Sequence, residues 1–233
     1  MVNTLSAFAL PTGFVYLKDI DPTIIEHLYY NTEENFIGTK IDGYKSNRVI
    51  ATIQAAEALS KVQKELQKDG YSLVIYDAYR PRRAVEHFIQ WTKNLSDIQE
   101  KTKYYPTISK EDIWKLGYIV DKSGHSRGST VDVTIIKDNN ALHNIEIKSR
   151  KLTNGETIQY LDDGTVDMGS SFDLFHESSN HDSLLIDNNC LKNRNYIREI
   201  MKRNGFNDYQ EEWWHFILKN EPFPDTYFDF EIE

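Results

Sequence analysis

The stretch Ser123-Gly-His125-Ser-Arg-Gly128-Ser-Thr-Val-Asp132 runs from a glycine-containing loop into an apolar segment, Val131–Ile136. Such a short apolar run is typical of a buried strand. Gly128 lets the backbone turn, so His125 in the loop and Asp132 at the strand start can face one point. Spacing alone leaves two interpretations open, namely a shared metal ion and an ordinary His–Asp hydrogen bond at a loop–strand junction.

The segments around this strand predict one domain of helices and strands over residues 1–233. Ser72–Tyr76 and Trp213–Leu218 are short apolar runs that favour strands. Apolar residues from Val49 to Leu66 recur at spacings of mostly three and four before Gly70, which predicts an amphipathic helix. Further helices are expected at 82–94, 110–116 and 191–204.

Residues 137–166 differ from the rest of the chain. The stretch is polar, contains Asn139-Asn140 and Asn154-Gly155, and alternates polar with apolar side chains at Ile145–Ile147 and Thr157–Tyr160. This pattern predicts an exposed hairpin inserted between the segments that carry the candidate chemistry. We expect no catalytic residue in it.

Composition excludes several classes of partner. The net charge of −9 argues against nucleic acid, since phosphate binding depends on Lys and Arg. The segment Met1–Pro11 has no positively charged start, and its apolar run is too short for a signal peptide or a membrane span. We therefore expect a cytoplasmic protein without a membrane partner, or a periplasmic one if a signal peptide has been removed.

Cys190 is the only cysteine. It excludes an internal disulfide and a thiolate zinc cluster, so any metal must rely mainly on nitrogen and oxygen ligands. Its place beside a predicted helix favours a buried apolar thiol over a nucleophile.

A second segment, Glu212-Trp-Trp-His215, adds the remaining parts of a catalytic zinc site. Two imidazoles and one carboxylate would hold the metal and leave a fourth position for water, whose proton the Glu212 carboxylate could take. In a regular strand, side chains three apart point to opposite faces. We therefore expect a bend or bulge between Glu212 and His215.

The other five histidines are weaker candidates. His27, His87 and His143 lie in segments without a matching carboxylate pattern. His176 and His181 are five apart, and that spacing does not place both rings on one side of a helix.

Together with Tyr79-Arg80-Pro81 upstream, these two segments resemble the VanX-type D-alanyl-D-alanine dipeptidases. The resemblance runs from Tyr30–Gly38 to Tyr227–Phe230, nearly the whole chain. These zinc metallopeptidases belong to a group that includes D-Ala-D-Ala carboxypeptidases and is similar in fold to the hedgehog signalling domain. The resemblance implies a single α+β domain with a central, mainly antiparallel sheet flanked by helices.

The resemblance also implies hydrolysis of the free dipeptide D-Ala-D-Ala, with one Zn²⁺ per chain. Matched position by position, the roles fall as follows: zinc ligands on His125, Asp132 and His215, the catalytic base on Glu212, the oxyanion-stabilising cation on Arg80, and the groups that hold the charged ends of the dipeptide on Tyr30, Ser123 and Asp173. Two features depart from the family pattern, Thr130 in place of the usual Ala and the longer insertion at 137–166.

Two alternatives stay open. One is a D,D- or L,D-carboxypeptidase that trims cell-wall stem peptides. The other is a non-catalytic zinc-containing binding module, against which Glu212 and Arg80 speak because a structural zinc needs neither. The sequence does not decide between glycopeptide resistance, recycling of wall fragments and peptidoglycan turnover, nor between a monomer and a homodimer.

Overall fold

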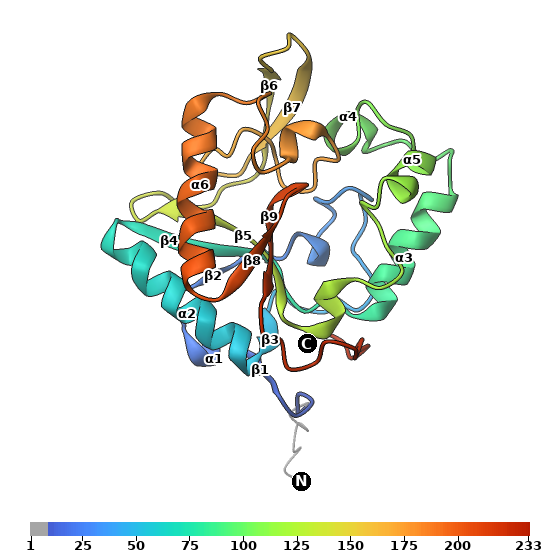
Figure 1. Ribbon diagram of the computed structural model, residues 1–233. Coiled ribbons are helices and arrows are strands. Elements are labelled where there is room, and N and C mark those ends of the chain that lie inside the picture. The colour runs from blue at the N-terminus through green and yellow to red at the C-terminus, as the bar shows by residue number, and fades with distance from the viewer. Residues whose placement is uncertain (1–8) are drawn as a thin grey trace.

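A five-stranded sheet forms the centre of the molecule in the computed structural model, which describes residues 9–233. One pair of neighbouring strands is parallel and the other three pairs are antiparallel. This confirms the α+β fold with a mainly antiparallel sheet (Figure 1). In sheet order the strands are β2 (Ile25–Glu26), β4 (Tyr71–Asp77), β5 (Thr130–Lys137), β9 (Glu212–Leu218) and β8 (Phe206–Tyr209).

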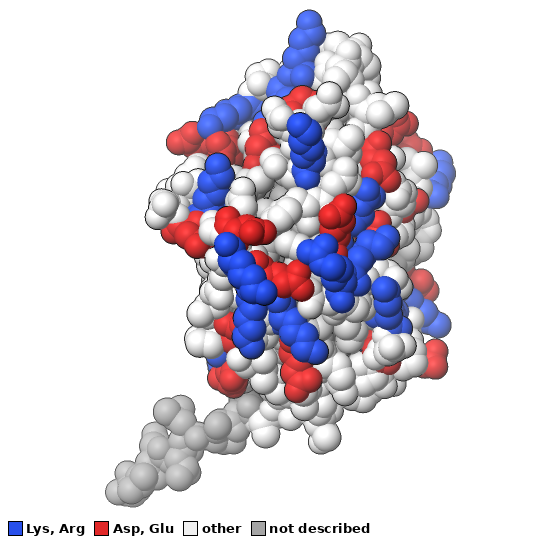
Figure 2. Space-filling model, turned by 60° about the vertical axis from the view of Figure 1, so that its left-hand side comes forward, with Lys and Arg blue, Asp and Glu red and all other residues white. Residues whose placement is uncertain are grey.

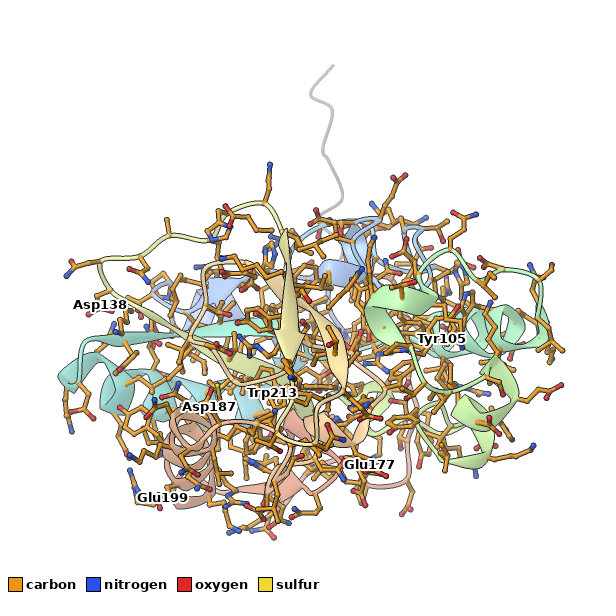
Figure 3. The ribbon with its side chains drawn as sticks, turned by 90° about the horizontal axis from the view of Figure 1, so that it is seen from above. Tyr105, Asp138, Glu177, Asp187, Glu199 and Trp213 are labelled. Carbon is orange, nitrogen blue, oxygen red and sulfur yellow. The ribbon has the colours of Figure 1, made fainter. Side chains whose placement is uncertain are left out.

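Helices lie on both sides of this sheet. The long helices α2 (Ile53–Lys68) and α6 (Asn188–Arg203) lie together on one side, where α2 contacts β4 and α6 contacts β8 (Figure 1). The opposite side holds α3 (Arg82–Lys93), α4 (Lys101–Tyr104) and α5 (Lys110–Lys115). Seen from above, Tyr105 marks the side of α4, and Asp187 and Glu199 mark that of α6 (Figure 3).

The expected helix in the Val49–Leu66 run begins later than its apolar pattern suggests. Residues Ile50–Thr52 form a strand, β3, which pairs antiparallel with β1 (Phe14–Tyr16), and the helix begins at Ile53. The reason is local, because the Thr52 hydroxyl accepts a hydrogen bond from the backbone N–H of Ala55 at 3.3 Å. This side-chain cap stabilises the helix start at that point.

The remaining short elements connect these parts. The 137–166 stretch contains an antiparallel hairpin, which projects from the top of the molecule in Figure 1. The short elements are the four-residue helix α1 (Leu17–Ile20), the hairpin strands β6 (Glu146–Lys151) and β7 (Thr157–Asp162), and the 3₁₀ helices η1 (Tyr29–Asn31), η2 (Gly124–Arg127) and η3 (Glu177–Ser179).

The apolar run of β5 explains the position of this strand at the centre of the sheet. Every residue from Thr130 to Ile136 is buried, so both faces of the strand are covered. Burial of apolar surface supplies about 25 cal/mol per Å² and so favours this placement over a surface one. The side chains at the start of β5, including that of Asp132, are therefore buried inside the protein.

The surface carries charges of both signs. On the face shown in Figure 2, Lys and Arg alternate with Asp and Glu and do not form a basic stripe. Within residues 9–233, no helix combines the length and the apolar character that crossing a membrane requires.

Candidate functional site

The sheet brings together the three residues expected to bind a metal. Asp132 on β5 and His215 on β9 are direct partners in the antiparallel register. His125 comes from η2, which Gly128 ends with a positive φ of 82° before the chain enters β5. One ligand atom of each side chain lies within 4.8 Å of the other two, so the three groups converge on one point.

The spacing of these atoms fits a tetrahedral ion. His125 Nε2 lies 3.4 Å from His215 Nδ1 and 3.3 Å from an Asp132 oxygen, and the other Asp132 oxygen lies 3.1 Å from His215 Nδ1. Zinc held tetrahedrally at about 2.0–2.1 Å from each ligand sets its ligand atoms about 3.3 Å apart. Two imidazoles and a carboxylate are also a donor set that zinc accepts, so the residues present fit this metal.

His125 is fixed in the orientation that metal binding needs. Its Nδ1 lies 2.8 Å from the carbonyl oxygen of Ala78, and a carbonyl only accepts hydrogen bonds, so Nδ1 carries the proton. Nε2 is then left with a free lone pair pointing at Asp132 and His215. A hydrogen bond on the far ring nitrogen is the usual support for a metal-binding imidazole.

Glu212 lies beside this cluster, within ion-pair distance of the His215 ring. Its Oε2 is 3.5 Å from His215 Nδ1. The pairing of β8 with β9 shifts register between Asp208 and Tyr209, which is the irregularity that side chains three apart on a strand require to share a site. Burial raises the pKa of Glu212 to about 7. A group of this kind can take and return a proton near neutral pH.

Arg80 is held against the cluster by a buried carboxylate that sequence reasoning missed. Its Nε donates to Asp77 at 2.8 Å, and its Nη2 lies 3.5 Å from Asp132. Asp77 is completely buried and also accepts a hydrogen bond from the Tyr44 hydroxyl at 2.6 Å. A signal is present in the sequence, since Asp77 directly follows the predicted strand Ser72–Tyr76 and lies three residues before Arg80.

The structure places Tyr30, Ser123 and Asp173 around the same cavity, which has a volume of about 160 Å³ and also exposes Glu212 and the ligand cluster. The Tyr30 hydroxyl donates to Asp173 Oδ2 at 2.8 Å.

Asp173 is the only non-glycine residue with a positive φ, 58°, within residues 9–233. Burial and the charge of Asp132 raise the pKa of Asp173 well above its usual range. A cationic group placed beside it would favour the ionised form.

The remaining histidines do not join the cluster. His176 is buried at the start of η3, where its Nδ1 accepts from the backbone N–H of Ser178 at 3.0 Å. His181 is completely buried, and neither ring nitrogen has a hydrogen-bond partner within residues 9–233. His143 lies in the insertion, and its side chain is 42 % exposed. Among the described residues, the group of side chains that could bind a metal ion consists of His125, Asp132 and His215.

Comparison with known proteins points to the same chemistry. The sequence model of the peptidase M15 family, described as D-Ala-D-Ala dipeptidase, matches residues 11–145 and 148–233. A D-alanyl-D-alanine dipeptidase of Enterococcus faecium is 37% identical over 95% of this chain and 98% of its own length. Proteins with the same name from Enterococcus faecalis and Streptomyces coelicolor are 37% and 36% identical, over 96% and 94% of this chain and 100% and 98% of their own lengths.

Proposed function

The chain belongs to the peptidase M15 family of D-Ala-D-Ala dipeptidases, and from this membership we propose that it hydrolyses D-alanyl-D-alanine to two D-alanines with one zinc ion. The observation that carries the proposal is the convergence of three ligand atoms on one side of a cavity that also exposes Glu212, Arg80 and Asp173. A zinc ion held by His125, Asp132 and His215 would supply an activated water and polarise the scissile carbonyl.

Glu212 moves the proton in this proposal. Its carboxylate is close enough to the ligand cluster to take a proton from the attacking water. It then passes the proton to the leaving amine nitrogen. Proton transfer by a positioned side chain contributes about 10²–10⁴ in rate.

Arg80 stabilises the oxyanion that forms when water attacks the peptide carbon. Its guanidinium is fixed by Asp77, lies above the ring of Tyr30 at 5.0 Å, and faces the cavity. A cation that is already in place acts on charge that appears only in the transition state, and therefore raises the rate of the chemical step.

The charged ends of the dipeptide are recognised by the other cavity residues. Asp173, with its carboxylate oriented by Tyr30, accepts the ammonium group, and Ser123 contributes to binding of the carboxylate. An N-acylated substrate or a long peptide would leave Asp173 buried without a cation, and an unpaired buried polar group lowers affinity. This arrangement favours a free dipeptide over a stem peptide.

The variant Glu212→Ala tests the assignment of the base. It should keep its zinc, since Glu212 is not one of the three ligands, and lose hydrolysis of D-Ala-D-Ala by about 10²–10⁴-fold. Zinc content and turnover are measured on the same preparation. Glu211→Ala is the matched control, because this neighbouring carboxylate is exposed and does not line the cavity. Turnover close to that of the unmodified enzyme in Glu212→Ala would refute the assignment.

The substrate class is tested by comparing free D-Ala-D-Ala, L-Ala-L-Ala and a pentapeptide that ends in D-Ala-D-Ala. We expect the free D,D-dipeptide to have the highest kcat/KM by far. A higher kcat/KM for the pentapeptide would identify the chain as a carboxypeptidase instead.

A further inference from the structure

The loop that carries Asp173 has no strand or long helix of its own to hold it. It runs from Met168 to Asn180 and contains only the single turn η3. Asp173 lies near its middle with a φ of 58°, a left-handed conformation that residues other than glycine adopt only at a cost in free energy. Contacts from elsewhere must therefore hold the loop in place.

One buried side chain of α6 supplies these contacts. Arg194 is completely buried, and its guanidinium donates four hydrogen bonds to the loop. Nε donates to the carbonyl oxygen of Met168 at 2.6 Å, and Nη2 donates to Ser170 Oγ at 3.1 Å. Nη1 donates to the carbonyl oxygen of Asn180 at 2.6 Å, and Nη2 also donates to that of Ser178 at 2.8 Å.

These four acceptors come from both ends of the loop. Met168 and Ser170 precede Asp173, whereas Ser178 and Asn180 follow it, so one planar guanidinium ties the two ends together. No carboxylate lies within ion-pair distance of Arg194 in the described part of the chain. Burial lowers the pKa of Arg194 to about 9, and the group is still charged at neutral pH. Three backbone carbonyl oxygens and one serine hydroxyl, all neutral, thus satisfy a buried cation.

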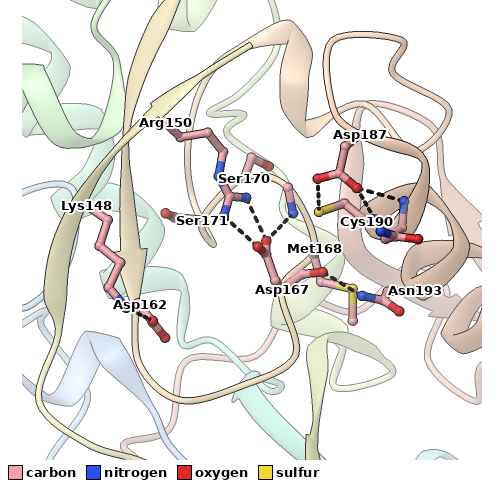
Figure 4. Close-up of polar contacts among 12 residues, drawn as sticks. Lys148, Arg150, Asp162, Asp167, Met168, Ser170, Ser171, Asp187, Cys190 and Asn193 are labelled. Atoms are coloured by element: carbon pink, nitrogen blue, oxygen red, sulfur yellow. Dashed lines mark hydrogen bonds and ion pairs between the residues drawn. The ribbon is translucent and has the colours of Figure 1, made fainter. Parts of the chain in front are cut away.

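Neighbouring contacts attach the start of the loop to α6 and to the inserted hairpin. Asn193 Nδ2 donates to the carbonyl oxygen of Asp167 at 2.8 Å, and the Asp167 carboxylate pairs with both terminal nitrogens of Arg150 at 2.6 and 2.5 Å (Figure 4). The backbone N–H of Leu161 donates to Ser171 Oγ at 2.7 Å. These contacts are all made to residues that precede Asp173 in the sequence. Arg194, by contrast, donates to residues on both sides of Asp173.

We propose that Arg194 is a positioning residue for the substrate, which holds Asp173 where it can accept the ammonium group of the dipeptide. Arg194 does not line the cavity and therefore acts only through the loop. The inference rests on the proposed function, in which Asp173 is the ammonium acceptor.

The test is a KM-against-kcat comparison on the zinc-loaded enzyme, with D-Ala-D-Ala and N-acetyl-D-Ala-D-Ala as substrates. Arg194→Lys keeps the charge but loses the planar fork, so it can tie only one end of the loop. We expect KM for D-Ala-D-Ala to rise by about tenfold or more, the value of one or two hydrogen bonds to a charged group, with kcat changed much less. Hydrolysis of the N-acetyl dipeptide, which has no ammonium, should stay as in the unmodified enzyme.

Three comparisons complete the experiment. Arg203→Lys is the matched control, because this arginine of the same helix makes an exposed ion pair with Glu65, and its KM should not change. Asp173→Asn should raise KM at least as much as Arg194→Lys, and the double variant should show no further rise, since both changes act on one contact.

The outcomes separate the two proposals. A raised KM in Asp173→Asn with an unchanged KM in Arg194→Lys would overturn the role of Arg194 but not the assignment of Asp173 as the ammonium acceptor. An unchanged KM in Asp173→Asn would overturn the ammonium site and, with it, this inference. A parallel fall in kcat for both substrates would show that Arg194 is merely structural.

A second variant covers the case in which Arg194→Lys does not fold. Ser170→Ala removes one of the four acceptors and leaves the buried guanidinium in place. It also removes the hydrogen bonds of this hydroxyl with Trp213 Nε1 at 3.0 Å and Ser179 Oγ at 3.1 Å. It should raise KM for D-Ala-D-Ala by a smaller factor than Asp173→Asn and leave the N-acetyl dipeptide unaffected. An unchanged KM in this variant would then decide against the proposal.

Discussion

The two halves of the candidate site are held by different means. The metal-binding half is held by the sheet, since Asp132 and His215 are paired in register and His125 enters from the turn just before β5. The half around Asp173 is held by side chains, above all by the guanidinium of Arg194 and the hydroxyl of Tyr30. Backbone pairing fixes the first half, whereas a few specific side-chain bonds fix the second.

This difference predicts how each half responds to mutation. Loss of a ligand should abolish the metal site without moving the backbone, because the ladder between β5 and β9 does not depend on that side chain. Loss of a side-chain contact near Asp173 should instead shift the loop and weaken substrate binding by a graded amount. Both expectations are open to direct measurement.

The largest effect is expected on the metal-binding half. His215→Ala removes one of the three proposed metal ligands, so we expect the purified variant to lose most of its zinc and to hydrolyse D-Ala-D-Ala about 10⁴-fold or more slowly. Zinc content by elemental analysis and turnover are the readouts. His143→Ala, at an exposed histidine of the insertion, should keep both. Full zinc occupancy in His215→Ala would remove His215 from the ligand set.

A change at the turn before β5 should destabilise the whole protein. Gly128 has a φ of 82°, and a Cβ atom placed on it would lie 2.2 Å from the ring of Phe14. We expect Gly128→Ala to lower the free energy of unfolding by about 2–4 kcal/mol, from the positive φ together with the clash.

Gly70→Ala is the matched control for this turn. Gly70 has a φ of 77° and no atom near the position of a Cβ, so it isolates the conformational cost of about 1 kcal/mol. Chemical denaturation of both variants measures the difference. An equal decrease in the free energy of unfolding in Gly128→Ala and Gly70→Ala would contradict a tight contact at Gly128.

Much of the metal-binding half could be predicted from the sequence, because strands and glycine turns leave local patterns. The sequence predicts a strand after Gly128 and an irregularity between Glu212 and His215. The structure contains both the strand and an irregular pairing in this part of β9. The start of α2 at Ile53 was missed, because apolar spacing does not distinguish the last residues of a strand from the first turn of a helix.

The role of Arg194 could not be read from the sequence for a different reason. Its acceptors are mostly backbone carbonyls, which every residue carries, so they leave no mark in the amino-acid pattern. The buried pair of Asp77 and Tyr44 is similar, since 33 residues separate its members and only the fold brings them together. Contacts of this kind depend on tertiary structure.

A smaller effect is expected around Asp173. Tyr30→Phe removes the hydroxyl that donates to Asp173 at 2.8 Å, and KM for D-Ala-D-Ala should rise by about three- to tenfold, the value of one hydrogen bond. Tyr29→Phe is the matched control, because its hydroxyl donates to Asp163 at the same distance and Tyr29 does not line the substrate cavity. Steady-state kinetics should show an unchanged KM there. Equal KM values in both variants would mean that Tyr30 does not orient Asp173 for binding.

The smallest effect concerns Thr130, which begins β5 two residues before Asp132. Thr130 is completely buried, and its hydroxyl has no hydrogen-bond partner within residues 9–233. Thr130→Val replaces this unpaired hydroxyl by a methyl group, so the free energy of unfolding should stay the same or rise by up to about 1 kcal/mol. The position of Asp132 should not change, because backbone pairing with His215 and its neighbours fixes the strand.

Thr52→Val is the matched control, and it should behave in the opposite way. The Thr52 hydroxyl is equally buried but lies 2.7 Å from Ser129 Oγ and accepts from the start of α2, so its loss should lower the free energy of unfolding by about 1–2 kcal/mol. Thermal unfolding of the two variants, together with kcat/KM for Thr130→Val, provides the measurement. A marked loss of activity in Thr130→Val would mean that a side chain, and not only the backbone ladder, positions the metal ligands, and the contrast between the two halves of the site would then fail.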